Sequence, residues 1–190
     1  LWTLGAEDSI ALSGTTQLSL GVSHNALRPD TVYSAGNAYT LPGNQAATDV
    51  QAGLFHTLHP EAKVYATVAR KSRLPTLKDR YSQRLGTYIE NPDLRAEKAL
   101  NYEVGYQATV RGLALEAAVF YSDVKDKIQS VANVAGVRSQ MRNAGRAHIS
   151  GVELGLRVSA GAWLDWGGNY TYTDMKNVSD RAIRLTDVPR

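Results

Sequence analysis

Residues 91–107, NPDLRAEKALNYEVGYQ, combine two conflicting local signals. The first half favours a helix start, because Asn91 or Asp93 can cap a helix and Pro92 suits the first helical position. The second half alternates strictly between apolar and polar residues, as a strand does, with one face formed by Leu100, Tyr102, Val104, Tyr106, Ala108 and Val110. We interpret the stretch as the end of a long loop, with one helical turn at most, followed by a strand.

The same alternation recurs along the chain. It resumes after Arg111-Gly112, which predicts a hairpin with a very tight turn. Similar hairpins are predicted around residues 1–23, 50–68 and 151–173. The sequence therefore predicts an all-β fold, an antiparallel up-and-down meander of about eight strands in four hairpins, and no helix.

Connection lengths and aromatic positions indicate the environment of these strands. Predicted turns within hairpins are short (near 12–15, 58–62, 111–112 and 159–163), whereas the connections between hairpins are long and polar (26–46, 72–97 and 129–147). Outer-membrane barrels have short periplasmic turns, long extracellular loops and aromatic girdles. Aromatic residues expected near strand ends are Trp2, Tyr102, Tyr121, Trp163, Trp166 and Tyr172. A membrane barrel is favoured, and the alternative is a soluble β-sandwich or lipocalin-like binding module.

Composition excludes several kinds of site. The chain has no cysteine, which excludes disulfides and thiolate chemistry, and its net charge of +3 gives no argument for nucleic acid. The four histidines (His24, His56, His59 and His148) are scattered, so we expect neither a metal site nor a bound cofactor. No phosphate-binding loop or nucleophile motif is present, so we expect no enzyme, and a β-barrel hydrolase is the weakest alternative.

Four phrases in order carry a family resemblance: VYATVARKSRLPTL (64–77), NPDLRAEKALNYEVGY (91–106), AAVFYSDVKDKIQ (117–129) and RNAGRAHISGVELGL (142–156). Together they resemble the barrel of TonB-dependent outer-membrane receptors, over roughly residues 49–189, and residues 5–25 also fit a barrel hairpin of that family. The resemblance implies a bacterial outer-membrane barrel of about 22 strands, filled by an N-terminal plug. Such receptors import a scarce nutrient, usually a ferric siderophore and sometimes cobalamin, haem or a sugar, with energy from TonB.

On this resemblance, residues 1–190 are a C-terminal part of the barrel, and the plug and the final strands lie outside the sequence. Glu103, Glu116, Glu153 and Arg157 are expected to face a wet lumen. The first and last strands would offer unpaired edges, so we expect the isolated piece to form an open curved sheet or to self-associate.

The loop between residues 70 and 95 is the densest basic segment. Guanidinium groups suit carboxylates, phosphates and catecholate oxygens, and tyrosines can stack on a planar ligand. The expected contacts to an anionic ligand, or to lipopolysaccharide phosphates, are Arg70, Lys71, Arg73, Lys78, Arg80, Tyr81, Arg84 and Tyr88. A second basic segment contains Arg138, Arg142 and Arg146. The absence of a histidine between Arg70 and Asn91 counts against haem as the ligand.

Overall fold

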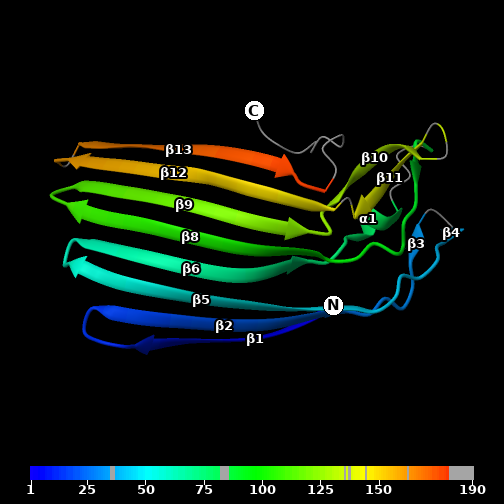
Figure 1. The fold of residues 1–190 in the computed structure, drawn as a ribbon, viewed down its shortest axis with the longest axis horizontal. Helices are drawn as coiled ribbons and strands as arrows, with labels where there is room; N and C mark the ends of the chain where they lie inside the picture. The colour runs from blue at the N-terminus through cyan, green and yellow to red at the C-terminus, as the bar shows by residue number, and fades with distance from the viewer. Residues whose placement is uncertain are drawn as a thin grey trace.

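Eight long strands lie side by side in one antiparallel sheet (Figure 1). The structure, a computed structural model, describes residues 1–34, 37–81, 86–134, 136, 138–143, 145–161 and 163–179. The sheet order is β1-β2-β5-β6-β8-β9-β12-β13, so each long strand pairs with the next long strand along the chain. The strands are β1 (Trp2–Ala11), β2 (Thr16–Leu27), β5 (Gln45–His59), β6 (Ala62–Arg73), β8 (Glu97–Val110), β9 (Leu113–Lys125), β12 (Arg146–Ala160) and β13 (Leu164–Asn177). The predicted eight-stranded meander is confirmed.

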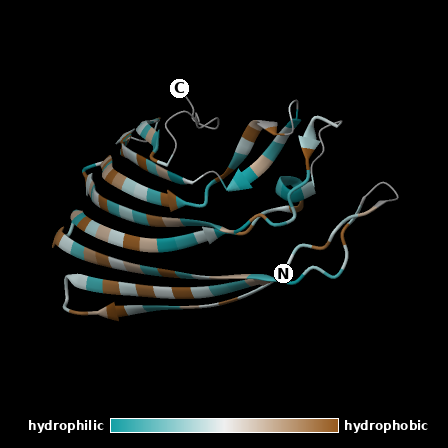
Figure 2. Cartoon of the chain, turned by 45° about the vertical axis from the view of Figure 1, so that its right-hand side comes forward, coloured by the Kyte–Doolittle hydropathy of each residue, from teal (hydrophilic) through white to brown (hydrophobic). Residues whose placement is uncertain are grey.

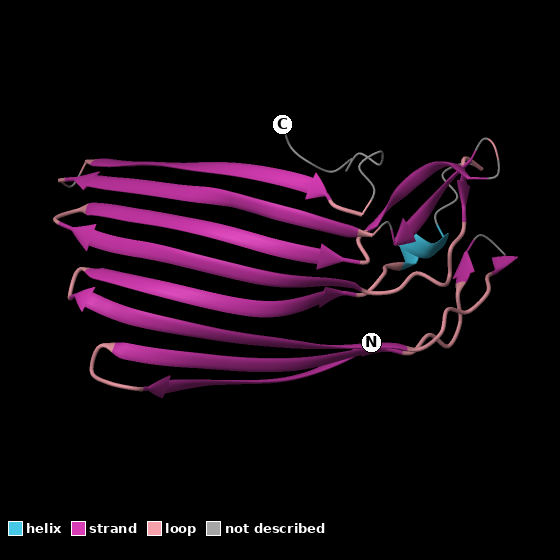
Figure 3. Cartoon of the chain, viewed as in Figure 1, coloured by secondary structure: helices cyan, strands magenta, loops and turns pink. Residues whose placement is uncertain are grey.

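The two ends of the sheet differ in their connections. Four short turns close the hairpins at one end, on the left of Figure 3, and every long connection lies at the other end. Arg111 and Gly112 join β8 to β9 with φ angles of 48° and 83°. Two successive residues with positive φ fit a two-residue turn whose twist matches that of the flanking strands. The predicted tight turn is therefore confirmed.

The long connections contain secondary structure that the sequence did not predict. Their described residues form a short helix and five short strands: β3 (Tyr33–Ser34), β4 (Asn37–Ala38), α1 (Leu77–Tyr81), β7 (Tyr88–Ile89), β10 (Ile128–Val134) and β11 (Arg138–Asn143). β10, β11 and β7 form a small sheet in which β11 and β7 run parallel. We call α1 with this small sheet the loop cluster. Within the described residues, no helix has the length and apolar character needed to cross a membrane.

The two faces of the large sheet have opposite chemistry. Val104, Val119 and Val152 lie in register on one face, and Val104 and Val119 are 56% and 54% exposed. Hydropathy alternates along each strand accordingly (Figure 2). A soluble sandwich would bury this apolar face under a second layer, but here the large sheet is a single layer. The arrangement is that of a barrel wall with a lipid-facing outer face and a polar inner face.

The secondary structure of residues 91–107 is largely as predicted. β8 begins at Glu97 and continues through the alternating residues, while residues 92 and 93 form a turn instead of a helix. The short helix lies earlier, at Leu77–Tyr81, so the expectation of no helix was wrong at that point. Leu94 is completely buried, and this anchors the turn against the loop cluster.

The large sheet is open. β1 and β13 lie at its two edges and each pairs with a single neighbour. This agrees with the expected open curved sheet. Self-association through these edges stays a prediction.

Candidate functional site

The loop cluster is fastened to the sheet at the turn that precedes β8. The carbonyl oxygen of Leu94 accepts hydrogen bonds from Gln45 Nε2 at 2.6 Å and from an Arg80 guanidinium nitrogen at 3.4 Å. The Asn91 amide donates to the carbonyl of Arg80 at 2.7 Å. The start of β5 and two points of the connection between β6 and β8 therefore meet at one buried place. This fixes where the loop cluster sits at the mouth of the sheet.

Helix α1 is held by a reciprocal cap. The Thr76 amide donates to Asp79 Oδ2 at 2.9 Å, and the Asp79 amide donates to Thr76 Oγ1 at 3.1 Å. Arg73 bridges the cap to the sheet, because its guanidinium contacts both Asp79 and Glu97 at 2.9 Å. Burial alone would raise the pKa of the Asp79 carboxyl, but the hydrogen bonds from Thr76 and Arg73 outweigh burial and hold that pKa below its ordinary value.

The β10–β11 hairpin docks on the same region through side-chain amides. Asn91 Nδ2 donates to the Met141 carbonyl at 2.8 Å, and Gln140 Nε2 donates to the Glu90 carbonyl at 2.9 Å. Asn143 accepts the Arg95 amide at 2.9 Å through Oδ1. Sequence reasoning missed these amide residues. Asparagine and glutamine at strand ends were a weak signal, because their partners lie about fifty positions away.

Four of the eight expected ligand contacts make interactions that hold the loop cluster in place. Arg73 forms the ion pairs described above, and Arg80 is only 1% exposed. Burial lowers the pKa of the Arg80 guanidinium despite the nearby acids. Tyr81 donates its hydroxyl to the Thr40 carbonyl at 2.6 Å, and the Tyr88 hydroxyl lies 2.6 Å from Ser130 Oγ. These four side chains hold the loop cluster together.

The other four expected contacts are distributed differently. Arg70 lies on the outer face and donates to the Thr48 carbonyl at 2.8 Å. Lys71 lies on the inner face, donates to Gln51 Oε1 at 2.7 Å, and borders a hollow of about 280 Å³ near the long-loop end. Lys78 is an exposed residue of α1. Arg84 lies outside the described residues. The structure does not bring the seven described side chains into one cluster, and ligand binding by the eight residues stays a prediction.

The second basic segment also divides between the loop cluster and the outer face. Arg142 contacts Gln140 Oε1 at 2.7 Å within β11, and Arg146 pairs with Asp123 at the start of β12. Arg138 pairs with Val134 in the β10–β11 hairpin. These three arginines form no single anion site.

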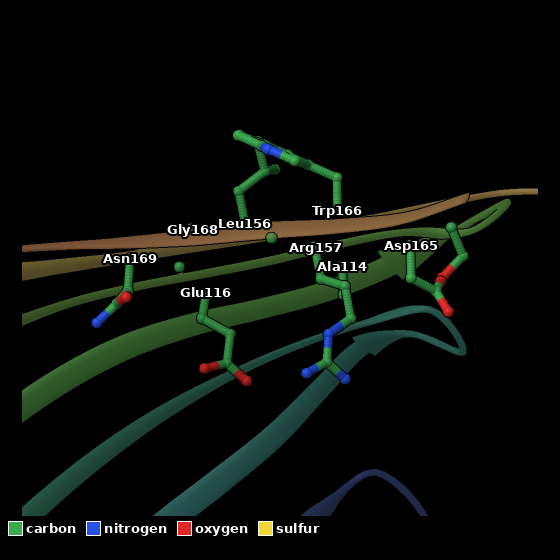
Figure 4. Close-up of a pocket in the computed structure, with 11 residues that line it drawn as sticks. Ala114, Glu116, Leu156, Arg157, Asp165, Trp166, Gly168 and Asn169 are labelled. Atoms are coloured by element: carbon green, nitrogen blue, oxygen red, sulfur yellow. The ribbon is translucent and has the colours of Figure 1, made fainter.

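The inner face is polar, as predicted for a lumen. Glu103 accepts a 2.6 Å hydrogen bond from Tyr65 Oη, and Glu116 and Arg157 border a hollow of about 910 Å³ near the short turns. Figure 4 shows Glu116 and Arg157 on one side of the sheet, with Leu156 and Trp166 on the other. Lumen-facing charge and lipid-facing apolar residues therefore alternate along the same strands.

The histidines make local contacts. His24 Nδ1 lies 2.8 Å from Thr48 Oγ1, and His56 Nδ1 lies 2.8 Å from Thr16 Oγ1. His148 lies near Asp123 on the outer face. Within the part of the chain that the structure describes, no group of three His, Asp or Glu side chains could hold a metal ion.

Comparison with known proteins adds a family. The family model for the TonB dependent receptor-like β-barrel matches residues 2–190. The ferric enterobactin receptor of Pseudomonas aeruginosa is 26% identical over an alignment that covers 100% of this chain and 27% of that protein. The pesticin receptor of Yersinia enterocolitica is 35% identical over 99 residues, which cover 50% of this chain and 14% of that protein. The chain thus spans about a quarter or less of these relatives.

A solved structure shows the same fold. The siderophore receptor PirA from Pseudomonas aeruginosa superposes with a TM-score of 0.70 at 24% identity, over 91% of this chain and 31% of that one. The superposition shows that the two chains share the same fold over this region. The chain belongs to the TonB-dependent receptor β-barrel family of the bacterial outer membrane.

Proposed function

We propose that this chain is a C-terminal part of the barrel wall of a nutrient receptor that binds a ferric siderophore and imports it with energy from TonB. The observation that carries the proposal is the alignment of the whole chain with a ferric enterobactin receptor. In this proposal, a plug domain and the last barrel strands lie outside the sequence, and TonB acts through that plug.

The loop cluster provides the geometry for capture at the outer surface. Lys71 and Lys78 form no ion pair within the described residues, so their charge is available to an anionic ligand. Ammonium groups act as point charges toward the oxygen atoms of such a complex. We propose that Lys71, Lys78 and Arg84 contact the ligand, while Arg73, Arg80, Tyr81 and Tyr88 fix the loops that present them. Arg70 faces the membrane side and is not assigned to this contact.

In this proposal, the carboxylates of the inner face keep that face in contact with water, and the receptor catalyses no reaction. Glu116 and Arg157 border the same open hollow, where water and polar plug residues would contact them. The matched relatives are named as receptors. The soluble binding module is not favoured, because the apolar face of the sheet is uncovered.

Uptake of ⁵⁵Fe-labelled siderophores by cells that express the full receptor, in a strain without other siderophore receptors, tests the proposal. We expect TonB-dependent uptake of at least one anionic siderophore. Lys71→Gln with Lys78→Gln should raise the half-saturating concentration at least about tenfold, because two charge-assisted contacts are lost. Lys63→Gln removes one lysine charge from the other end of β6 and should leave uptake unchanged. TonB-independent uptake, or uptake of no siderophore in the panel, would overturn the proposal.

A further inference from the structure

Three basic residues form a row on the outer face of the sheet. The strand register pairs Lys98 of β8 with Lys125 of β9, and Lys125 with Arg146 of β12. All three residues are exposed, and they lie on the same face as Tyr102 and Tyr121. Residues directly opposite on neighbouring strands have Cβ atoms about 5 Å apart. We call Lys98, Lys125 and Arg146 the cation row.

The charge of the cation row is only partly balanced. Arg146 pairs with both carboxylate oxygens of Asp123. Within the described residues, neither Lys98 nor Lys125 forms an ion pair. Like charges placed directly opposite on a sheet destabilise it. An anion whose oxygen atoms reach two or three neighbouring strands would remove this repulsion.

The position of the row relates it to the membrane surface. Lys98 lies four residues beyond Tyr102, toward the long-loop end, which is about 13 Å along the strand. For a strand tilted by about 45°, this distance corresponds to roughly 9 Å along the membrane normal. Tyr102 and Tyr121 form an aromatic pair with ring centroids 6.4 Å apart, as expected at the level of the lipid headgroups. The cation row therefore lies in the headgroup layer of the outer leaflet.

A ligand inside the barrel cannot reach the row, because side chains alternate between the faces and these three point outward. The occupant has to come from the membrane. We propose that the cation row binds the phosphate groups of lipid A, the lipid anchor of lipopolysaccharide, whose acyl chains would lie along the apolar residues below. Arg70 and Lys176 flank the row one step nearer the aromatic pair, so a lipid with two phosphates could contact both levels.

The test uses the full receptor in detergent micelles that contain bisphosphorylated lipid A, with bound lipid counted by native mass spectrometry. Lys98→Gln with Lys125→Gln should weaken lipid A binding at least about tenfold, since each charge-assisted contact is worth about one decade in affinity. Lys98→Arg with Lys125→Arg should retain binding. The matched control, Lys63→Gln with Arg157→Gln, removes the same charge from the inner face and should also retain binding.

Lipid A without phosphates and phosphatidylglycerol provide the comparison lipids. We expect both to bind more weakly than bisphosphorylated lipid A. Equal binding of phosphate-free lipid A, equal binding of phosphatidylglycerol, or equal loss in the inner-face control would each overturn the proposal. Heat-modifiable gel migration checks that each variant is folded. Siderophore uptake should be unchanged in the Lys98→Gln, Lys125→Gln variant, so failure of this proposal and failure of the proposed transport function can be distinguished.

Discussion

Tyr65 of β6 and Gly105 of β8 occupy facing positions on the inner face. The Tyr65 ring lies over Gly105, in the space that a Cβ atom would occupy, and its hydroxyl donates to Glu103 at 2.6 Å. It also stacks with Phe55 at a centroid distance of 5.9 Å. A glycine in a strand often marks a close approach of this kind. Alternation alone predicted the face on which Gly105 lies, but the ring above it depends on the register between two strands.

Gly105→Ala should destabilise the barrel by about 1–3 kcal/mol, because the new methyl group has to displace the Tyr65 ring. Gly155 is the matched control, since a Cβ atom there would first meet Glu116 Cβ at 3.6 Å. Gly155→Ala should therefore stay within about 1 kcal/mol of the unmodified receptor. Denaturant unfolding of the full receptor in micelles measures both changes. Equal effects of the two substitutions would contradict the close packing of Tyr65 on Gly105.

At the scale of elements, strands were predictable and the loop cluster was not. The alternation of apolar and polar residues predicts the long strands, and Arg111-Gly112 predicts a tight turn. α1 had a usable signal, because Thr76 and Asp79 have the spacing of a capping box. β7 and β11 had none, since a contact such as Gln140 to Glu90 joins residues fifty positions apart. Sequence reasoning also missed that Arg73 and Arg80 brace the loops, because their partners lie 6, 24 and 14 positions away in a connection without a periodic pattern.

The hydrogen-bonded cap of α1 should be destabilised at acidic pH. The pKa of Asp79 is lowered in the folded chain, so its stabilising contribution is present above the ordinary aspartate pKa and is lost as pH falls through the lowered value. Amide exchange in α1, corrected for the intrinsic rate, should therefore accelerate below about pH 4. Asp79→Asn should show fast exchange at neutral pH and little further change in acid. Asp165→Asn, near the short turns, is the control and should leave exchange in α1 unaltered.

At the scale of the whole molecule, the chain is part of a barrel wall that has lipid on one side and water on the other. Leu156 and Trp166 project from one side of the sheet, and Glu116 and Arg157 project from the other (Figure 4). A wall of this kind needs no second layer, because lipid covers the apolar face. The period of two in the sequence predicted the two faces, and the connection lengths and aromatic positions were needed to assign the apolar face to lipid. Within the proposed transport function, the nutrient was not predictable from this sequence, because its recognition would depend on loops and on a plug that the barrel strands do not encode.

Spin labels placed singly at residues 102, 103, 104, 106 and 107 of β8, in the full receptor reconstituted into bilayers, test the central claim most directly. The account predicts that labels at Tyr102, Val104 and Tyr106 collide preferentially with oxygen, which concentrates in lipid. Labels at Glu103 and Gln107 should be shielded from lipid-dissolved oxygen because they face the lumen. Alternation with this phase would confirm a lipid-facing and a lumen-facing side. Uniform accessibility along the five positions, or alternation with the opposite phase, would contradict it.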